Sequence, residues 1–251
     1  MNPNEAIGIF DSGIGGATVL KEILKILPNE NYIYYSDSRN NPYGDKSDKQ
    51  INELCEHIVK LFIKQKCKAI VIACNTASAK SAQYLREKYT NIPFIAIEPA
   101  YKMVYDYAYS EPTLVMATKG TIESEKFNLL YHTYDNHKTI LLSCVGLADI
   151  IEEGNEKKIK AYLKEHLEPY KGKVKNVVLG CTHYPLIQDE IQDVLGQVTF
   201  FNGAPYLAKH LNEVLEEKDL INHHAKERTI QFIDSSNDEQ KKKRFFEIIK
   251  E

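Results

Sequence analysis

Two segments far apart in the chain share one construction, and this duplication limits the architectures open to the sequence. The first, IVIACNTASA, covers residues 70–79, and the second, NVVLGCTHYPLI, covers 176–187. Each has an apolar run typical of a buried strand, then a small residue, a cysteine, and hydroxyl or amide side chains. The chain is therefore predicted to contain two similar halves, each presenting one thiol, Cys74 or Cys181, at the end of a strand.

Apolar runs rich in β-branched residues alternate with helical periodicity along the whole chain. This alternation predicts parallel sheets covered by helices on both faces. Strands are expected at 6–10, 32–35, 69–73, 94–96, 113–117, 139–142, 176–179 and 229–233, and amphipathic helices over 19–27 and 51–62. The predicted fold class is α/β, with two pseudosymmetric domains that are each a mostly parallel sheet flanked by helices.

No linker composition marks a domain boundary, so the duplication has to supply one. We expect a first α/β domain of residues 1–97 plus about 205–251, and a second of residues 98–204, because the last strand and helix have no place in the second half. The charge run 241–244 is predicted to be a solvated helix face. Open parallel sheets bind ligands at the carboxyl ends of their strands, so the predicted active site is the interdomain cleft.

The composition argues against several classes of partner. With 32 basic and 35 acidic residues the net charge is −3, which offers no basic field for nucleic acid. No apolar run approaches the roughly 20 residues that cross a bilayer, and no signal peptide is evident, so we expect a cytoplasmic protein with no membrane partner. The five cysteines are expected to be reduced, and they include no CxxC pair, so no metal site is predicted.

Loops after other predicted strands also hold candidate site residues. Asp11 and Ser12 precede glycines that open a helix, an arrangement whose N–H groups suit an anion such as a carboxylate. A tight turn in which one of them caps the helix is an equal alternative. In the polar loop 36–47, Pro42 and Gly44 restrict the backbone around Tyr43, which suits a polar group of a ligand, although an ordinary surface loop is the alternative.

The duplicated segments hold the chemistry. Cys74 precedes Asn75 and Thr76 at a predicted helix N-terminus, a location that lowers the pKa of a cysteine and favours the thiolate. The second thiol is followed by Thr182 and His183. A lone cysteine is more often a small buried hydrophobe, but the matched placement favours two thiols acting on opposite faces of one carbon. Proton removal from one face and delivery to the other inverts a stereocentre, so the first hypothesis is a racemase or epimerase.

The remaining cysteines, Cys55, Cys67 and Cys144, lack this polar context and are assigned to packing.

The same segments resemble glutamate racemases of the aspartate/glutamate racemase superfamily. DSGIGG from Asp11, NPYG from Asn41, ACNTAS from Ala73 and GCTHYP from Gly180 occur in the same order and at similar spacing over nearly the whole chain. The resemblance implies a cofactor-independent enzyme that interconverts L- and D-glutamate for peptidoglycan synthesis, with glutamate as its small-molecule partner. It leaves the oligomeric state open, a homodimer included.

The resemblance also implies roles for individual residues. Cys74 and Cys181 correspond to the two catalytic bases, with Asp11 near the first and His183 and an acidic residue, Glu152, near the second. The implied substrate contacts are Asp11, Ser12, Pro42, Tyr43, Gly44, Asn75, Thr76, Thr118, Thr121, Thr182 and His183. The adjacent Glu153 makes the register of the acidic residue less certain, and the segment around Asn202 departs from the family pattern.

Two alternatives stay open from the sequence. One alternative to a glutamate racemase is a racemase of aspartate or another amino acid in the same superfamily. The other is a non-catalytic module that binds a ligand or senses redox state through its thiols. Redox sensing requires the two cysteine Cα atoms to lie within about 7 Å of each other, whereas a substrate between them keeps them farther apart.

Overall fold

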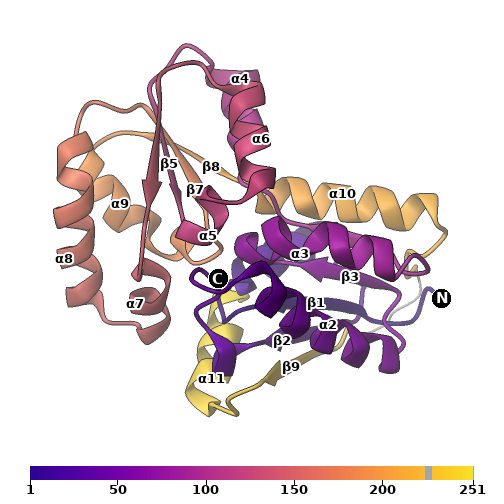
Figure 1. Cartoon of the computed structure of the whole chain (residues 1–251). Coiled ribbons are helices and arrows are strands. Elements are labelled where there is room, and N and C mark those ends of the chain that lie inside the picture. Colours follow the sequence, from indigo (N-terminus) through magenta and orange to yellow (C-terminus); the bar gives the residue numbers. More distant parts are fainter. Residues whose placement is uncertain (224–227, 251) are drawn as a thin grey trace.

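The computed structural model describes residues 1–223 and 228–250, whose strands form two separate parallel sheets (Figure 1). The first sheet has the order β4-β3-β1-β2-β9, with β1 (Ile7–Asp11), β2 (Tyr32–Ser36), β3 (Ala69–Ile72), β4 (Phe94–Ala96) and β9 (Ile230–Asp234). The second has the order β6-β5-β7-β8, with β5 (Thr113–Ala117), β6 (Thr139–Ser143), β7 (Asn176–Gly180) and β8 (Thr199–Asn202). The predicted α/β class with parallel sheets is confirmed.

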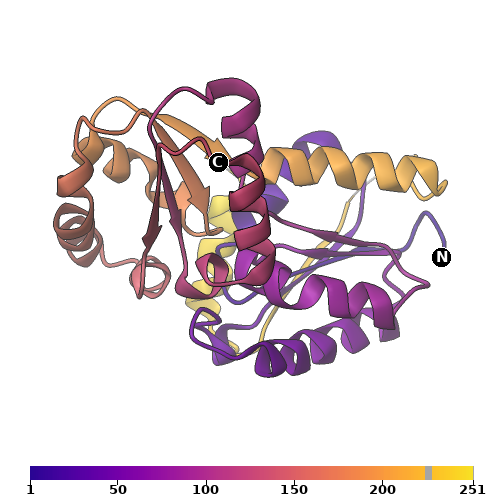
Figure 2. The same ribbon diagram turned by 45° about the horizontal axis from the view of Figure 1, so that its top comes forward.

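Helices cover both faces of the first sheet, as Figure 2 shows. One face packs against α1 (Ala17–Ile26), α10 (Ala204–Glu217) and α11 (Glu239–Ile248), and the other against α2 (Asp48–Lys64) and α3 (Asn75–Lys88). Neighbouring residues of a strand point to opposite faces, so Ile9 and Val71 belong to the first core while Phe10 and Ile72 belong to the second. These strands are buried on both faces, which explains their continuous apolar runs.

The second sheet is layered in the same way. One face packs against α7 (Leu147–Glu153), α8 (Glu156–Leu167) and α9 (Gln188–Leu195), and the other against α4 (Tyr101–Ala108) and α6 (Glu125–Tyr134). A short helix, α5 (Lys119–Ile122), follows β5, and 3-10 turns lie at Ser38–Asn40, Glu168–Tyr170 and Tyr184–Ile187. None of the described helices is long and apolar enough to cross a bilayer.

The predicted strands all have counterparts that differ by a residue or so at their ends, but β8 was not predicted. It is a four-residue edge strand in which only Phe201 is fully buried, so its alternation is too weak to see in the sequence. Near the other end of the chain, β9 pairs with β2 in the first sheet. The domain boundaries near residues 97 and 205 stay a prediction.

The prediction that the three remaining cysteines serve packing alone holds for two of them. Cys55, on the apolar face of α2, and Cys67, just before β3, lie in the core between α2, α3 and the first sheet. Cys144 follows β6 and is buried in the core of the second sheet. It also borders the cavity described below, so packing is only part of its setting.

Candidate active site

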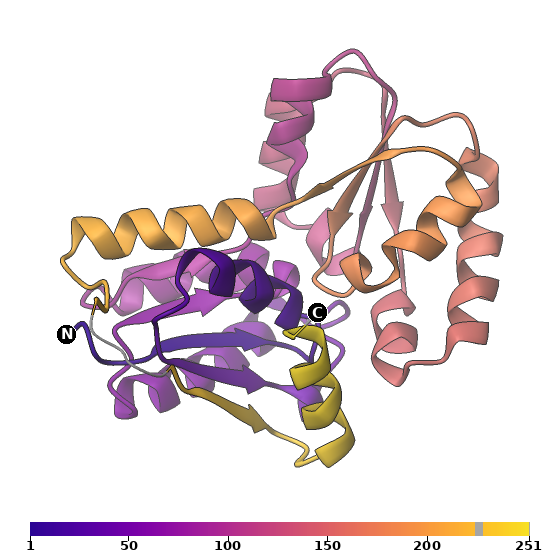
Figure 3. The ribbon, with the colours of Figure 1, turned by 180° about the vertical axis from the view of Figure 1, so that it is seen from behind.

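Four loops from the carboxyl ends of neighbouring strands meet between the two sheets, where Figures 1 and 3 show the two units in contact. In the first sheet β1 lies beside β3, and in the second β5 lies beside β7. Thr182, after β7, donates a hydrogen bond from Oγ1 to Asp11 Oδ2 at 3.0 Å. Thr76 and Thr118 share a hydrogen bond of 2.9 Å between their hydroxyls. The strand ends of the two halves therefore face each other.

A cavity of about 40 Å³ lies among these loops. Cys181, Thr182 and His183 border it from one side, and the 41–45 loop borders it from another. Its lining comprises Ser12, Asn41, Pro42, Tyr43, Gly44, Asp45, Thr76, Thr118, Lys119, Cys144, Val145, Gly146, Ala148, Asp149, Cys181, Thr182 and His183.

Cys74 lies at the N-terminus of α3, directly behind this lining. Its thiol is 3.9 Å from the hydroxyl of Ser12, which borders the cavity. Burial raises the pKa of Cys74 well above its usual value, and repulsion from Asp11 adds to the rise, while the N–H of Ala77 opposes it. The prediction that the helix N-terminus lowers this pKa is therefore wrong, because desolvation outweighs the helix end.

Cys181 belongs to a chain of three side chains that ends in a carboxylate. Its Sγ lies 3.7 Å from His183 Nδ1, and His183 Nε2 lies 2.6 Å from Glu152 Oε2. Of the two adjacent glutamates on α7, Glu152 is the one that points inward, whereas Glu153 pairs with Lys158 at the surface.

The pKa values of the histidine and glutamate move in the directions that favour an ion pair. Burial lowers the pKa of His183, but Cys181 and Glu152 outweigh it, so the pKa stands well above its usual value. Burial likewise raises the pKa of Glu152, but His183 and Lys241 outweigh it and bring it to about 2. The imidazolium and the carboxylate therefore stabilise each other in a buried setting.

Asp11 organises the glycine-containing loop that follows β1. Its carboxylate accepts hydrogen bonds from the backbone N–H of Gly16 at 2.5 Å and of Ser12 at 2.8 Å, besides the one from Thr182. Burial raises the pKa of Asp11, and the charge of His183 opposes this rise. Asp11 thus ties the loop of the first half to the second half.

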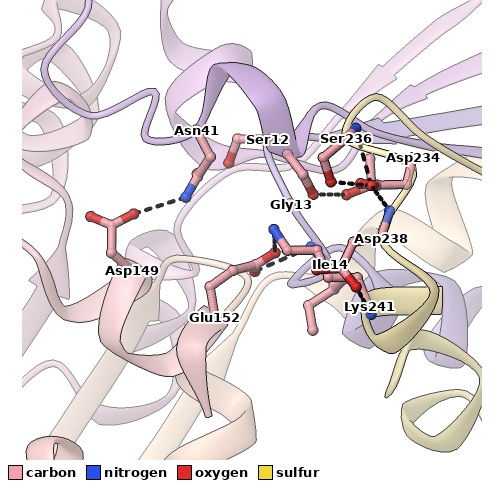
Figure 4. A network of polar contacts seen from close by, with 12 residues as sticks. Ser12, Gly13, Ile14, Asn41, Asp149, Glu152, Asp234, Ser236, Asp238 and Lys241 are labelled. Atoms are coloured by element: carbon pink, nitrogen blue, oxygen red, sulfur yellow. Dashed lines mark hydrogen bonds and ion pairs between the residues drawn. The ribbon is translucent and has the colours of Figure 1, made fainter. Parts of the chain in front are cut away.

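Two positions of this loop must be glycine because side chains of the second half lie very close to them. A Cβ on Gly13 would lie 2.7 Å from Glu152 Oε2, and one on Gly15 would lie 2.5 Å from His183 Nδ1. The N–H of Ile14 donates to both oxygens of Glu152, at 3.2 and 3.3 Å (Figure 4). The anion that this loop binds here is therefore a carboxylate of the protein itself, and a side chain at either glycine would displace it.

The sequence comparisons place this arrangement among known proteins. A family model described as Asp/Glu/Hydantoin racemase matches residues 7–211. The chain belongs to this racemase family. A relative named glutamate racemase, from Clostridium perfringens (strain SM101 / Type A), is 42% identical over 240 residues, which cover 94% of this chain and 92% of that protein.

Solved structures of family members agree. A glutamate racemase from Francisella tularensis, solved in complex with D-glutamate, has a TM-score of 0.84 at 31% identity and covers 99% of this chain and 95% of its own. The Escherichia coli glutamate racemase, solved with L-glutamate and the activator UDP-MurNAc-ala, has a TM-score of 0.79 at 30% identity, covering 90% and 89% of the two chains.

In this chain of the racemase family, the structure brings most of the site residues predicted from the sequence to the cavity, but not all of them. Asp11, Cys74, Asn75 and Thr121 lie outside its lining. Thr121 is buried and bonded to the hydroxyls of Thr76 and Thr118, and Asn75 borders a second cavity beside α6. Tyr43 borders the cavity, but its hydroxyl donates to Asp37 Oδ2 at 2.6 Å and so is already engaged within the protein.

Several lining residues were missed by the sequence reasoning. Asn41 donates to Asp149 at 2.8 Å across the interface between the loop 41–45 and α7. Asp149 lies one helical turn before Glu152 on α7, and this spacing puts both carboxylates on one face of the helix. The spacing is visible in the sequence and could have identified Asp149. Among residues 1–223 and 228–250, no cluster of His, Cys, Asp or Glu side chains is arranged to hold a metal ion.

We expect Gly15→Ala to lower kcat/KM on the order of a hundredfold, because the added methyl group would force His183 away from Cys181. Steady-state assays with glutamate measure the effect. Gly196→Ala is the control for lost stability. It strains a left-handed backbone at a position where no atom lies within 4 Å of the new Cβ, and it should keep its activity. Equal activity in the two variants would contradict the role given to the close approach.

We also expect Glu152 to make stability depend on pH. Its pKa is about 2 when folded against a usual 4.5, so its contribution is present above pH 4.5 and is lost as the pH falls towards 2. The shift corresponds to about 3 kcal/mol at most. Urea unfolding at pH 7 and pH 3 should show a smaller loss for Glu152→Gln than for the parent protein. An identical pH dependence in both would refute the buried ion pair.

Proposed function

We propose that this protein is a glutamate racemase that interconverts L- and D-glutamate through two thiols, without a cofactor. The observation that carries the proposal is the matched pair of cysteines, each after a strand end of one of two facing sheets. Cys181 borders the cavity, Cys74 lies behind Ser12, and repulsion from Cys181 contributes to the raised pKa of Cys74. Glutamate bound to the Francisella tularensis and Escherichia coli enzymes supports the choice of substrate.

The two thiols differ in the substrate-free protein. His183, whose pKa is raised, is protonated near neutral pH, and its Nδ1 lies 3.7 Å from the sulfur of Cys181. Cys74, buried beside Asp11, keeps its proton because its pKa is raised. The two thiols therefore have opposite charges beside them, which suits a two-base inversion in which one thiol starts as the base and the other as the acid.

In the proposed reaction the thiolate of Cys181 removes the α-proton from one face of the amino acid. The C–H bond breaks, an S–H bond forms on Cys181, and the electron pair stays on the α-carbon. Cys74 then delivers its own proton to the opposite face, which forms the inverted C–H bond and leaves a thiolate on Cys74. In the reverse direction the two thiols exchange roles.

The residues that hold the substrate are also a proposal. Ser12, Thr76, Thr118 and Thr182 border the cavity, and the hydroxyls of the first three can donate to the substrate carboxylates, while residues 42–44 close another side. Asn75 and Thr121 would support this set from behind rather than touch the substrate. Fixed donors of this kind matter because a misplacement of about 1 Å can cost on the order of a hundredfold in rate. The D-glutamate produced would serve peptidoglycan synthesis, and the cytoplasmic location stays a prediction.

We expect Cys74→Ser and Cys181→Ser each to lower racemisation of glutamate by at least about a thousandfold, because a hydroxyl is a far weaker base. Cys67→Ser, at the opposite end of β3 from Cys74, is the matched control and should racemise normally. Polarimetry measures turnover of both enantiomers, with aspartate as the comparison substrate. In deuterium oxide, each product should contain solvent deuterium at the α-carbon.

Two results would count against the proposal. Normal turnover in both thiol variants would reject the two-thiol mechanism. Racemisation of aspartate but not of glutamate would reject the substrate.

A further inference from the structure

Glu152 is held at its second oxygen by a cation from the C-terminal helix. Lys241 Nζ, on α11, lies 3.0 Å from Glu152 Oε1 (Figure 4). His183 occupies the other oxygen, Oε2. The side chain of Lys241 is only 22% exposed and that of Glu152 only 7%, so water screens this pair weakly. The carboxylate therefore bridges the histidine beside Cys181 and a lysine that lies outside the cavity lining.

A second contact from the same helix holds the backbone of α7. Arg244, one turn after Lys241, donates from Nη1 to the carbonyl oxygen of Glu152 at 2.8 Å. Between them, Lys242 and Lys243 are exposed, and within the described part of the chain they form ion pairs with glutamates of their own helix. The prediction that the run 241–244 is a solvated helix face is thus wrong for its first and last residues, which turn inward to α7.

The start of α11 is itself fixed to the first sheet. Asp234, the last residue of β9, accepts hydrogen bonds at Oδ2 from the backbone N–H of Ser236 and of Asp238, both at 3.1 Å, and also from the Ser236 hydroxyl (Figure 4). Asp238 then caps α11 by accepting from the N–H of Gln240 at 2.8 Å and of Lys241 at 3.4 Å. Lys241 therefore reaches Glu152 from a defined position.

The charge of Lys241 acts on Glu152 together with those of several other groups. It contributes to lowering the pKa of Glu152, after the larger effects of burial and His183. Titratable and charged groups on several surrounding elements interact with Glu152. They are Asp11 and Tyr34 of the first sheet, Asp149 of α7, His183 after β7, and Lys241 and Arg244 of α11.

We propose that Lys241 is a positioning residue for the Cys181 side of the reaction. By fixing Glu152 Oε1, it keeps Oε2 directed at His183 Nε2, and so keeps His183 Nδ1 directed at the sulfur. The inference rests on the proposed two-thiol function, and it predicts an effect on one thiol only, because Lys241 and Arg244 of α11 both contact Glu152, whose Oε2 holds His183 beside Cys181.

The first test compares variants at neighbouring positions of α11. Lys241→Met should lower kcat/KM on the order of tenfold, while Lys241→Arg should largely restore it and Lys242→Met should have no effect. Loss of the positive charge raises the pKa of Glu152, so the acidic limb of the kcat/KM profile should move to higher pH in Lys241→Met alone. A purely structural role would lower kcat/KM at every pH without moving that limb.

The second test separates the two thiols. Because the enantiomers have equal free energy, kcat/KM must fall equally in both directions, so turnover cannot reveal the affected side. In deuterium oxide, Cys74→Ser leaves Cys181 to exchange the α-hydrogen of one enantiomer, and adding Lys241→Met should slow that exchange about tenfold. In the Cys181→Ser background, the same addition should leave exchange by Cys74 unchanged.

The outcomes distinguish the inference from the function on which it rests. If both thiol variants racemise glutamate normally, the two-thiol mechanism fails. If they are inactive but Lys241→Met matches Lys242→Met in rate and pH profile, only the role of Lys241 fails. Equal slowing of exchange in both thiol backgrounds, or a loss of rate with an unmoved acidic limb, would also overturn that role.

Discussion

The buried ion pair between His183 and Glu152 is the interaction on which the site depends. Removing an ionised carboxylate and an imidazolium from water costs several kcal/mol per ion unless each finds close partners. Here the histidine has Cys181 and Glu152, and the carboxylate has the histidine, Lys241 and the N–H of Ile14. Those partners come from both sheets, so the pair is satisfied only when the two halves are docked.

This requirement explains the glycines after β1. Seen in the sequence, the G-x-G-G pattern suggests a loop open to an external anion. In the structure the space above Gly13 is filled by the carboxylate of Glu152, and the space above Gly15 by the ring of His183. The missing side chains are therefore a condition for the contact between the halves. The loop serves the second thiol, although it belongs to the strand beside the first.

The sequence predicts the parts of this site that depend on strand ends. Continuous apolar runs locate β3 and β7, and so place Cys74 and Cys181 at the carboxyl edges. What it misses depends on distances between segments. From the sequence, Lys241 is predicted to be a surface charge, because no neighbouring residue indicates that α11 starts beside α7. The pKa of Cys74 was predicted in the wrong direction because a helix N-terminus is visible in sequence, whereas full burial beside Asp11 is not.

The two halves share a backbone design but give their thiols opposite surroundings, and chemistry supplies a reason. Two thiols in identical buried sites would both be protonated, and the protein would then hold two acids and no base. An imidazolium beside Cys181 and a carboxylate behind Cys74 break that equivalence before any substrate arrives. The charge that maintains this difference comes from Glu152, and two of the residues that hold Glu152, Lys241 and Arg244, lie at the far end of the chain, on α11. The asymmetry of the site therefore begins with His183 inside the second segment and is completed by Glu152 and α11, which lie outside the duplication.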